Sequence, residues 1–89
     1  MKKILVISGG ISKERVISLD TGKQVAKELA RNNYIVKIIE PDFKLINEIE
    51  LFKPNIIFNA LHGQFGEDGY IQTIFETTGI PYTHSGVIP

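Results

Sequence analysis

The stretch Ile4-Leu5-Val6-Ile7-Ser8-Gly9-Gly10 decides the fold of this chain, because four consecutive apolar residues run directly into two glycines. A short, continuous apolar run of this kind is typical of a strand that is buried on both faces of a parallel sheet. The paired glycines indicate a tight turn where the chain leaves the strand. The sequence therefore predicts an α/β domain whose first strand, over residues 4–7, lies inside the sheet.

Helical and strand patterns alternate after this strand. Residues 18–30 carry apolar or small side chains at helical spacing, with Ser18 as the expected N-cap and Asp20 near the positive helix start. Gly22 on the inner face costs roughly 1 kcal/mol of helix propensity against alanine, which indicates that this helix approaches the sheet closely. The other expected elements are strands at 34–39, 55–61 and 82–83 and helices at 43–52 and 68–78, the last one capped by Gly79.

This β-α-β-α-β-α-β order predicts parallel strands joined by right-handed crossovers. We expect residues 1–89 to form a single Rossmann-like three-layer domain, with a four-stranded parallel sheet of order 2-1-3-4. Ligands of such sheets bind beyond the carboxyl ends of the strands. Polar residues and glycines concentrate in the loops expected at that edge, at 9–17, 62–67 and 83–87.

Composition narrows the classes of function. Ten Lys and Arg balance ten Asp and Glu over 89 residues, and a net charge of zero argues against binding to nucleic acid or an anionic membrane. The chain has no cysteine, which excludes a disulfide, a cysteine-based zinc site and a thiol nucleophile. The apolar run at 4–7 is shorter than the roughly 7–15 residues of a signal-peptide core, and no run approaches the roughly 20 residues of a membrane span. We therefore expect a cytoplasmic protein.

The first loop offers two features with two interpretations each. Gly9-Gly10-Ile11-Ser12 lacks both G-x-G-x-x-G and the G-K-[ST] of a P-loop, so a simple turn is favoured over a phosphate cradle. Glu14 either forms a solvated charge pair with Lys13 or Arg15, or receives the ammonium group of a ligand at the mouth of the cleft. Its position alone favours the charge pair.

The loop after the third strand offers two more candidates. His62 follows an apolar strand directly and is either satisfied by backbone carbonyls or donates to a ligand carboxylate. A metal site is not indicated, because His84 is the only other histidine and no cluster has ligand spacing. Asp68 is a candidate N-cap, and Glu67 could orient a neighbouring group.

Three motifs stand in order along the chain and together carry a family likeness. They are Gly9-Gly10-Ile11-Ser12-Lys13-Glu14-Arg15 with Ser18-Leu19, His62-Gly63-Gln64-Phe65-Gly66-Glu67-Asp68-Gly69, and Gly79-Ile80-Pro81-Tyr82-Thr83-His84-Ser85-Gly86-Val87. This arrangement resembles the N-terminal domain of the D-alanine–D-alanine ligases, which are ATP-grasp enzymes. The likeness covers the whole chain, which would form only about the first third of such an enzyme.

The resemblance implies a ligase that joins two D-alanines for peptidoglycan synthesis, and hence for cell wall biogenesis and cell shape. ATP and Mg²⁺ would serve to phosphorylate the carboxylate of the first D-alanine, and the amine of the second would attack the acyl phosphate. The ATP-grasp central and C-terminal domains that hold nucleotide and metal would lie outside residues 1–89. No cofactor is therefore expected on this chain, which we expect to be inactive alone.

The resemblance also implies roles for individual residues. Glu14 would be the catalytic and substrate-binding residue that receives the ammonium group of the first D-alanine. Ile17 would line that subsite, His62 would approach the carboxylate end of the substrate, and Glu67 would support the site. His84 is a departure, since many members have glycine there in a T-G-S-G sequence.

Two other interpretations stay open beside the ligase. The chain could be a stand-alone module that binds a small amino acid or a nucleotide. It could also be an assembly domain, because the fourth strand is expected to lack a covering helix. Its partners would then be the missing ATP-grasp domains or a second copy in a homodimer.

Overall fold

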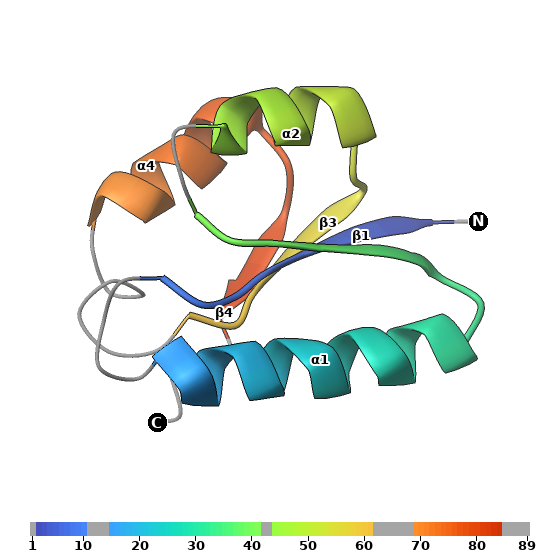
Figure 1. The fold of residues 1–89 in the computed structure, drawn as a ribbon. Coiled ribbons are helices and arrows are strands. Elements are labelled where there is room, and N and C mark those ends of the chain that lie inside the picture. The colour runs from blue at the N-terminus through green and yellow to red at the C-terminus, as the bar shows by residue number, and fades with distance from the viewer. Residues whose placement is uncertain (1, 11–14, 42–43, 62–68, 85–89) are drawn as a thin grey trace.

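The computed structural model describes residues 2–10, 15–41, 44–61 and 69–84. Strands and helices alternate along these residues, as Figure 1 shows. The elements follow in the order β1 (Lys3–Ile7), α1 (Arg15–Arg31), β2 (Ile35–Ile39), α2 (Leu45–Phe52), β3 (Ile56–Asn59), α4 (Gly69–Thr78) and β4 (Tyr82–His84).

The four strands form one parallel sheet of order β2-β1-β3-β4, which confirms the predicted topology. Helix α1 covers one face of the sheet, and α2 and α4 cover the other (Figure 1). The register brings the carboxyl ends of the strands into one row. Ile7 pairs with Ile39 on one side and with Asn59 on the other, and Asn59 pairs with His84. The ends of β1 and β3 are therefore neighbours, as the order 2-1-3-4 requires.

The central strand β1 separates two hydrophobic clusters, because its side chains alternate between the two faces of the sheet. Residues Ile4 to Ile7 are all buried, as the apolar run predicted. The cluster under α2 and α4 consists of Leu5, Ile7, Leu45, Ile49, Ile57, Leu61, Ile74 and Phe75. The cluster under α1 is smaller and consists of Ile4, Val6, Ala26 and Ala60.

Helix α1 begins earlier than the sequence predicted. It starts at Arg15, so Ser18 lies inside the helix and its prediction as the N-cap was wrong. The hydroxyl of Ser18 bonds instead to backbone groups of β1's turn and of the segment after β3. Asp20 lies in the second turn, where it accepts a hydrogen bond from the Gln24 amide at 2.8 Å. Capping preferences are local, and tertiary hydrogen bonds have overridden them here.

Gly22 lies where α1 touches the sheet. A Cβ atom at this position would lie 2.7 Å from both Cβ and Oγ of Ser8 on β1's turn. The predicted close approach of helix and sheet is confirmed. Gly79 is confirmed as the C-cap of α4, since its φ is +71° and its N–H donates to the Glu76 carbonyl at 3.2 Å.

Strand β3 ends at Asn59, two residues before the predicted end at Leu61. The Asn59 side-chain oxygen accepts the N–H of Leu61 at 3.0 Å and turns the backbone out of the strand. Helix α2 begins at Leu45 rather than at 43, which lies outside the described residues. The predicted N-cap Asp68 of the last helix also lies outside them.

Candidate functional site

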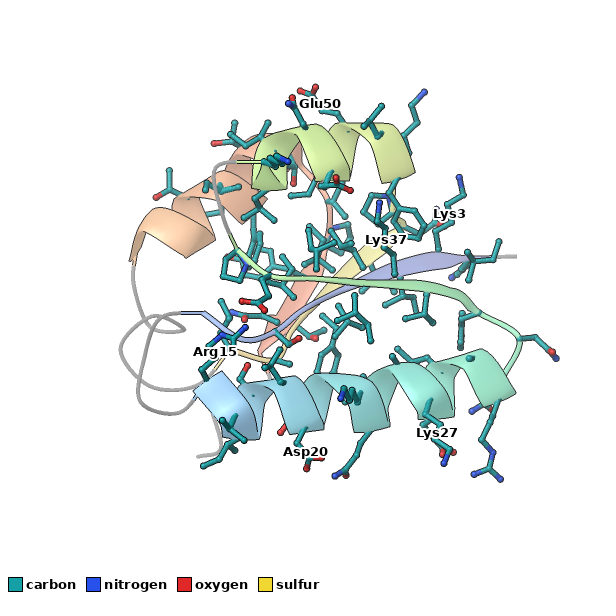
Figure 2. All side chains as sticks on the ribbon, in the orientation of Figure 1. Lys3, Arg15, Asp20, Lys27, Lys37 and Glu50 are labelled. Atoms are coloured by element: carbon teal, nitrogen blue, oxygen red, sulfur yellow. The ribbon has the colours of Figure 1, made fainter. Side chains whose placement is uncertain are left out.

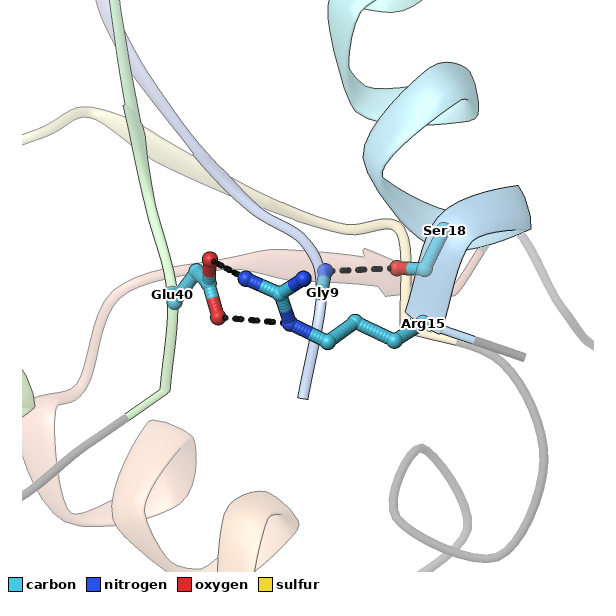
Figure 3. Close-up of polar contacts among 4 residues, drawn as sticks. All are labelled: Gly9, Arg15, Ser18 and Glu40. Atoms are coloured by element: carbon cyan, nitrogen blue, oxygen red, sulfur yellow. Dashed lines mark hydrogen bonds and ion pairs between the residues drawn. The ribbon is translucent and has the colours of Figure 1, made fainter. Parts of the chain in front are cut away.

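Segments from three elements meet at the carboxyl edge of the sheet. Residues 8–10 leave β1, Arg15 begins α1, and Ala60 follows β3. Glu40 follows β2 at the same edge. Figure 3 shows how the side chains of Arg15, Ser18 and Glu40 lie around Gly9.

The turn after β1 has a backbone that only glycine adopts readily. Gly9 has a φ of +92° and Gly10 a φ of +88°. Space is also short, because a Cβ atom at Gly9 would lie 2.9 Å from the carboxylate of Glu40. The N–H of Gly9 donates to Oγ of Ser18 at 2.8 Å. An amide that a phosphate cradle would offer is thus already bonded, which supports the interpretation of this segment as a turn.

The described residues do not fit a nucleotide or its metal ion. Besides the bonded amide of Gly9, the guanidinium group of Arg15 is bonded to Glu40. Over residues 2–10, 15–41, 44–61 and 69–84, no group of three His, Cys, Asp or Glu side chains gathers as metal ligands would.

Arg15 lies at the start of α1, as Figure 2 shows. It forms a two-bond ion pair with Glu40, which follows β2 (Figure 3). Their closest atoms, Nη2 and Oε1, are 2.5 Å apart. Both side chains are exposed, at 47% and 42%, so the pair contributes no more than about 1 kcal/mol. Arg15 was one of the two cations predicted to pair with Glu14, which lies outside the described residues. Among the described residues, Arg15 bonds to Glu40.

The structure places Ile17 on the first turn of α1, with 59% of its surface exposed. Its neighbour Val16 is 74% exposed. Two apolar side chains are thus left uncovered at the edge where the sequence predicted a ligand. The other three predicted site residues, Glu14, His62 and Glu67, lie outside the described residues.

Two of those residues adjoin described residues in the sequence. Glu14 directly precedes the first residue of α1, and His62 directly follows Leu61 beyond the end of β3. Ser18 and Ala60, within this edge, are joined by a hydrogen bond of 2.7 Å. His84 is the last residue of β4 and pairs through its backbone with Asn59.

Sequence reasoning missed the part that three residues play in building this edge. Ser18 and Asn59 are both fully buried polar residues that bond to backbone groups, and Glu40 packs against Gly9. A signal existed for Asn59, which is a polar residue at the end of an apolar strand. None existed for Glu40, because its partners lie 25 and 31 residues away in sequence and belong to no shared motif.

Two cavities among the described residues lie away from this edge. A groove of about 590 Å³ lies between α2 and α4 and reaches Pro54 and Ile80, which precede β3 and β4. A second cavity of about 370 Å³ on the α1 side is lined by Lys2, Tyr34 and Ile56 among others.

Tyr82 is the first residue of β4, and its pKa is raised above 10.0 by partial burial and then by the Glu76 carboxylate. None of the described helices is both long and apolar enough to span a membrane.

Comparisons with known proteins identify relatives over nearly the whole chain. Residues 40–85, just over half of the chain, match the family described as D-ala D-ala ligase N-terminus. A D-alanine–D-alanine ligase of Pelagibacter ubique is 75% identical over 87 residues, covering 98% of this chain and 29% of its own length. One of Acidiphilium cryptum is 51% identical over 89 residues, covering 98% of this chain and 30% of its own length.

The fold is found in solved relatives as well. The crystal structure of D-alanine–D-alanine ligase from Bacillus anthracis complexed with ATP matches with a TM-score of 0.77 and 35% identity. That match covers 93% of this chain and 28% of the other. The present chain thus spans less than a third of the length of these relatives. On its sequence and its fold, the chain belongs to the family of D-alanine–D-alanine ligase N-terminal domains.

Proposed function

We propose that these residues form the N-terminal part of a ligase that joins two D-alanines at the expense of ATP. Their task is to shape the subsite of the first D-alanine. The observation that carries the proposal is the similarity to the ligases over nearly the whole chain, whose β1 turn, α1 start and β3 end meet at one edge. That edge is where parallel sheets bind their ligands.

The residues of this chain would bind and orient the substrate. Glu14 would accept a charge-assisted hydrogen bond from the ammonium group of the first D-alanine. Ile17 would contact its methyl side, consistent with the exposure of this side chain on α1. His62 would donate to the carboxylate end, and Glu67 would support the site. Holding the two reacting groups in attack geometry is a recognised source of rate acceleration.

Nucleotide and metal would bind to parts of the whole protein outside these residues. The described residues show neither a phosphate cradle nor a cluster of metal ligands. The ligase from Bacillus anthracis was crystallised as a complex with ATP, which supports ATP as the energy source. Use of Mg²⁺, a role in peptidoglycan synthesis and a cytoplasmic location, where ATP is available, are parts of the same proposal.

The proposal is tested with the Glu14→Gln variant of the whole protein. Loss of the carboxylate removes one charge-assisted hydrogen bond and leaves the substrate ammonium unpaired. Such bonds are worth about 1.5–3 kcal/mol, so kcat/KM for D-alanine should fall by about 10- to 100-fold. The KM for ATP should stay unchanged. Dipeptide formation and ADP release are the measurements.

Glu28→Gln provides the matched control. It makes the same chemical change on α1, at an exposed site near the far end of the helix. We expect it to keep the kinetics of the unmodified protein. An unchanged kcat/KM for D-alanine in the Glu14→Gln variant would show that Glu14 does not bind the substrate. Failure of the unmodified protein to make the dipeptide would refute the proposed function itself.

A further inference from the structure

The side chain of Ser18 connects three segments of the candidate site. It is fully buried, and its Oγ accepts a hydrogen bond from the N–H of Gly9 at 2.8 Å. The same hydroxyl donates to the carbonyl of Ala60 at 2.7 Å. One side chain on α1 therefore bonds to the turn after β1 and to the segment after β3, and Figure 3 shows the bond to Gly9.

This arrangement is unusual for a serine inside a helix. A helical serine ordinarily faces solvent or bonds to the carbonyl of the preceding turn. Ser18 instead reaches partners that lie 9 and 42 residues away in sequence. Close packing of Gly22 on Ser8, one turn further along α1, brings the helix near enough to the sheet for these bonds to form.

Gly9 is held from its other side as well. The carboxylate of Glu40 lies against it, and Arg15 of α1 binds that carboxylate (Figure 3). The first turns of α1 therefore reach Gly9 in two ways, directly through Ser18 and indirectly through Arg15 and Glu40. The positions of α1, the glycine turn and the end of β3 are therefore fixed relative to one another.

We propose that Ser18 is a positioning residue for D-alanine, because its hydroxyl sets the distance between the two segments that carry the substrate-binding side chains. Ile17 precedes Ser18 directly, Glu14 lies four residues before it, and His62 lies two residues after Ala60. The inference rests on the proposed function. We call the two hydrogen bonds of the Ser18 hydroxyl, to Gly9 and to Ala60, the bridge. Displacements as small as 1 Å can lower a rate by about 100-fold, so loss of the bridge would slow the reaction although Ser18 does not contact the substrate.

A purely structural role is the competing explanation, because a buried hydroxyl that satisfies two backbone groups also stabilises the fold. The two roles differ in what they do to the kinetics. A structural loss lowers the amount of folded enzyme, which lowers the apparent kcat and leaves the KM values for D-alanine and ATP unchanged. A positioning loss weakens the use of D-alanine alone.

The test compares Ser18→Ala with Ile49→Val in the whole protein. Ile49 belongs to the hydrophobic cluster on the opposite face of the sheet, so its truncation destabilises the fold without altering the bridge. We expect Ser18→Ala to raise the KM for D-alanine by about tenfold with the KM for ATP unchanged. Ile49→Val should lower the unfolding midpoint and leave the D-alanine kinetics unchanged. Equal effects of Ser18→Ala on both substrates, or none on D-alanine, would overturn the inference.

A second measurement needs no variant and remains decisive if Ser18→Ala does not fold. Hydrogen exchange of the Gly9 amide in the whole protein requires its bond to Ser18 to open. If the bridge positions the substrate, saturating D-alanine must stabilise the bridge in return and slow this exchange by more than it slows exchange of the Ile49 amide, which reports the general stabilisation by a bound ligand. An unchanged Gly9 rate in a protein that makes the dipeptide would overturn the inference and leave the proposed function intact.

Discussion

At the scale of single residues, the contact between Gly22 and Ser8 determines how closely α1 lies on the sheet. The Gly22→Ala variant would place a methyl group 2.7 Å from Cβ of Ser8, an atom that moves only with the backbone. Alanine gains about 1 kcal/mol of helix propensity, but a forced shift of a packed helix costs about 1–3 kcal/mol. Because the gap is so short, we expect the clash to win and the free energy of unfolding to fall by about 1–2 kcal/mol.

The measurement for Gly22→Ala is the urea midpoint of the protein. Lys23→Ala is the matched control, since Lys23 is the next residue of α1 and is exposed. It should leave the midpoint nearly unchanged. A Gly22→Ala protein as stable as the unmodified one would show that helix and sheet are not in close contact here.

The surroundings of Tyr82 predict that the folded protein loses stability at alkaline pH. The ring of Tyr82 packs on Phe75 with centroids 5.0 Å apart, and its hydroxyl donates to Glu76 at 3.4 Å. Partial burial and then the Glu76 carboxylate raise the pKa of Tyr82 above 10.0 in the folded protein. The unfolded chain therefore releases this proton first. The stabilisation is complete below pH 10 and is lost as the pH rises through the folded pKa.

The expected result is a larger fall of the urea midpoint between pH 9 and pH 11 in the unmodified protein than in Tyr82→Phe. Tyr34→Phe makes the same change in the connection between α1 and β2 and serves as the control. Parallel pH dependence of the unmodified protein and Tyr82→Phe would contradict the raised pKa.

At the scale of elements, an ion pair ties the edge strand β2 to α2. Lys37 and Glu48 approach to 2.5 Å, with side chains 42% and 31% exposed. Lys37 also lies 6.0 Å from the centre of the Phe52 ring. Solvent screening limits such a pair, so a double-mutant cycle of Lys37→Met and Glu48→Gln should give a coupling energy of about 0.5–1 kcal/mol.

Salt distinguishes this pair from a buried one. The coupling energy should shrink in 1 M NaCl, where the screening length is about 3 Å. The Arg31–Glu28 pair, at 3.5 Å and with side chains 71% and 68% exposed, should give a smaller value and is the internal control. A coupling of more than about 2 kcal/mol that persists in salt would contradict the screened description.

Local pattern predicted the kinds of elements and their order, but not all of their ends. The apolar run at 4–7 identified β1, and helical spacing identified α1, because both patterns record which side chains face the core. The start of α1 was misplaced by three residues since Ser18 resembles a cap. Its actual partners, Gly9 and Ala60, come together only when the sheet has formed. End positions of this kind depend on tertiary contacts and not on neighbouring residues.

The candidate site was predictable in the same measure. Strand order 2-1-3-4 placed the ends of β1 and β3 side by side, and the register of Ile7 with Asn59 confirms it. Ile17 is exposed at that edge, and its role in a substrate subsite stays a prediction. The supporting contacts of Ser18, Glu40 and Asn59 were not predictable, because each joins segments that no local motif connects.

At the scale of the whole molecule, the sheet has cover on both faces and its own hydrophobic cluster on each. The carboxyl edge is where the proposed D-alanine subsite would lie, and the Gly9 amide at that edge is already bonded to Ser18. In the proposed enzyme, ATP would bind to parts of the protein outside these residues. A partial cleft supplies only some of the contacts that a small ligand needs.

The 89-residue chain by itself should therefore bind D-alanine weakly and release no phosphate from ATP. Each tenfold loss of affinity corresponds to about 1.4 kcal/mol, and the missing contacts leave a dissociation constant above about 10 mM. Amide shifts of Gly9, Ser18 and Ala60 during a D-alanine titration measure it, with L-alanine as the stereochemical control. Saturable, D-selective binding below about 1 mM would instead favour a stand-alone amino-acid-binding module, because the edge would then be a complete site without the rest of a ligase.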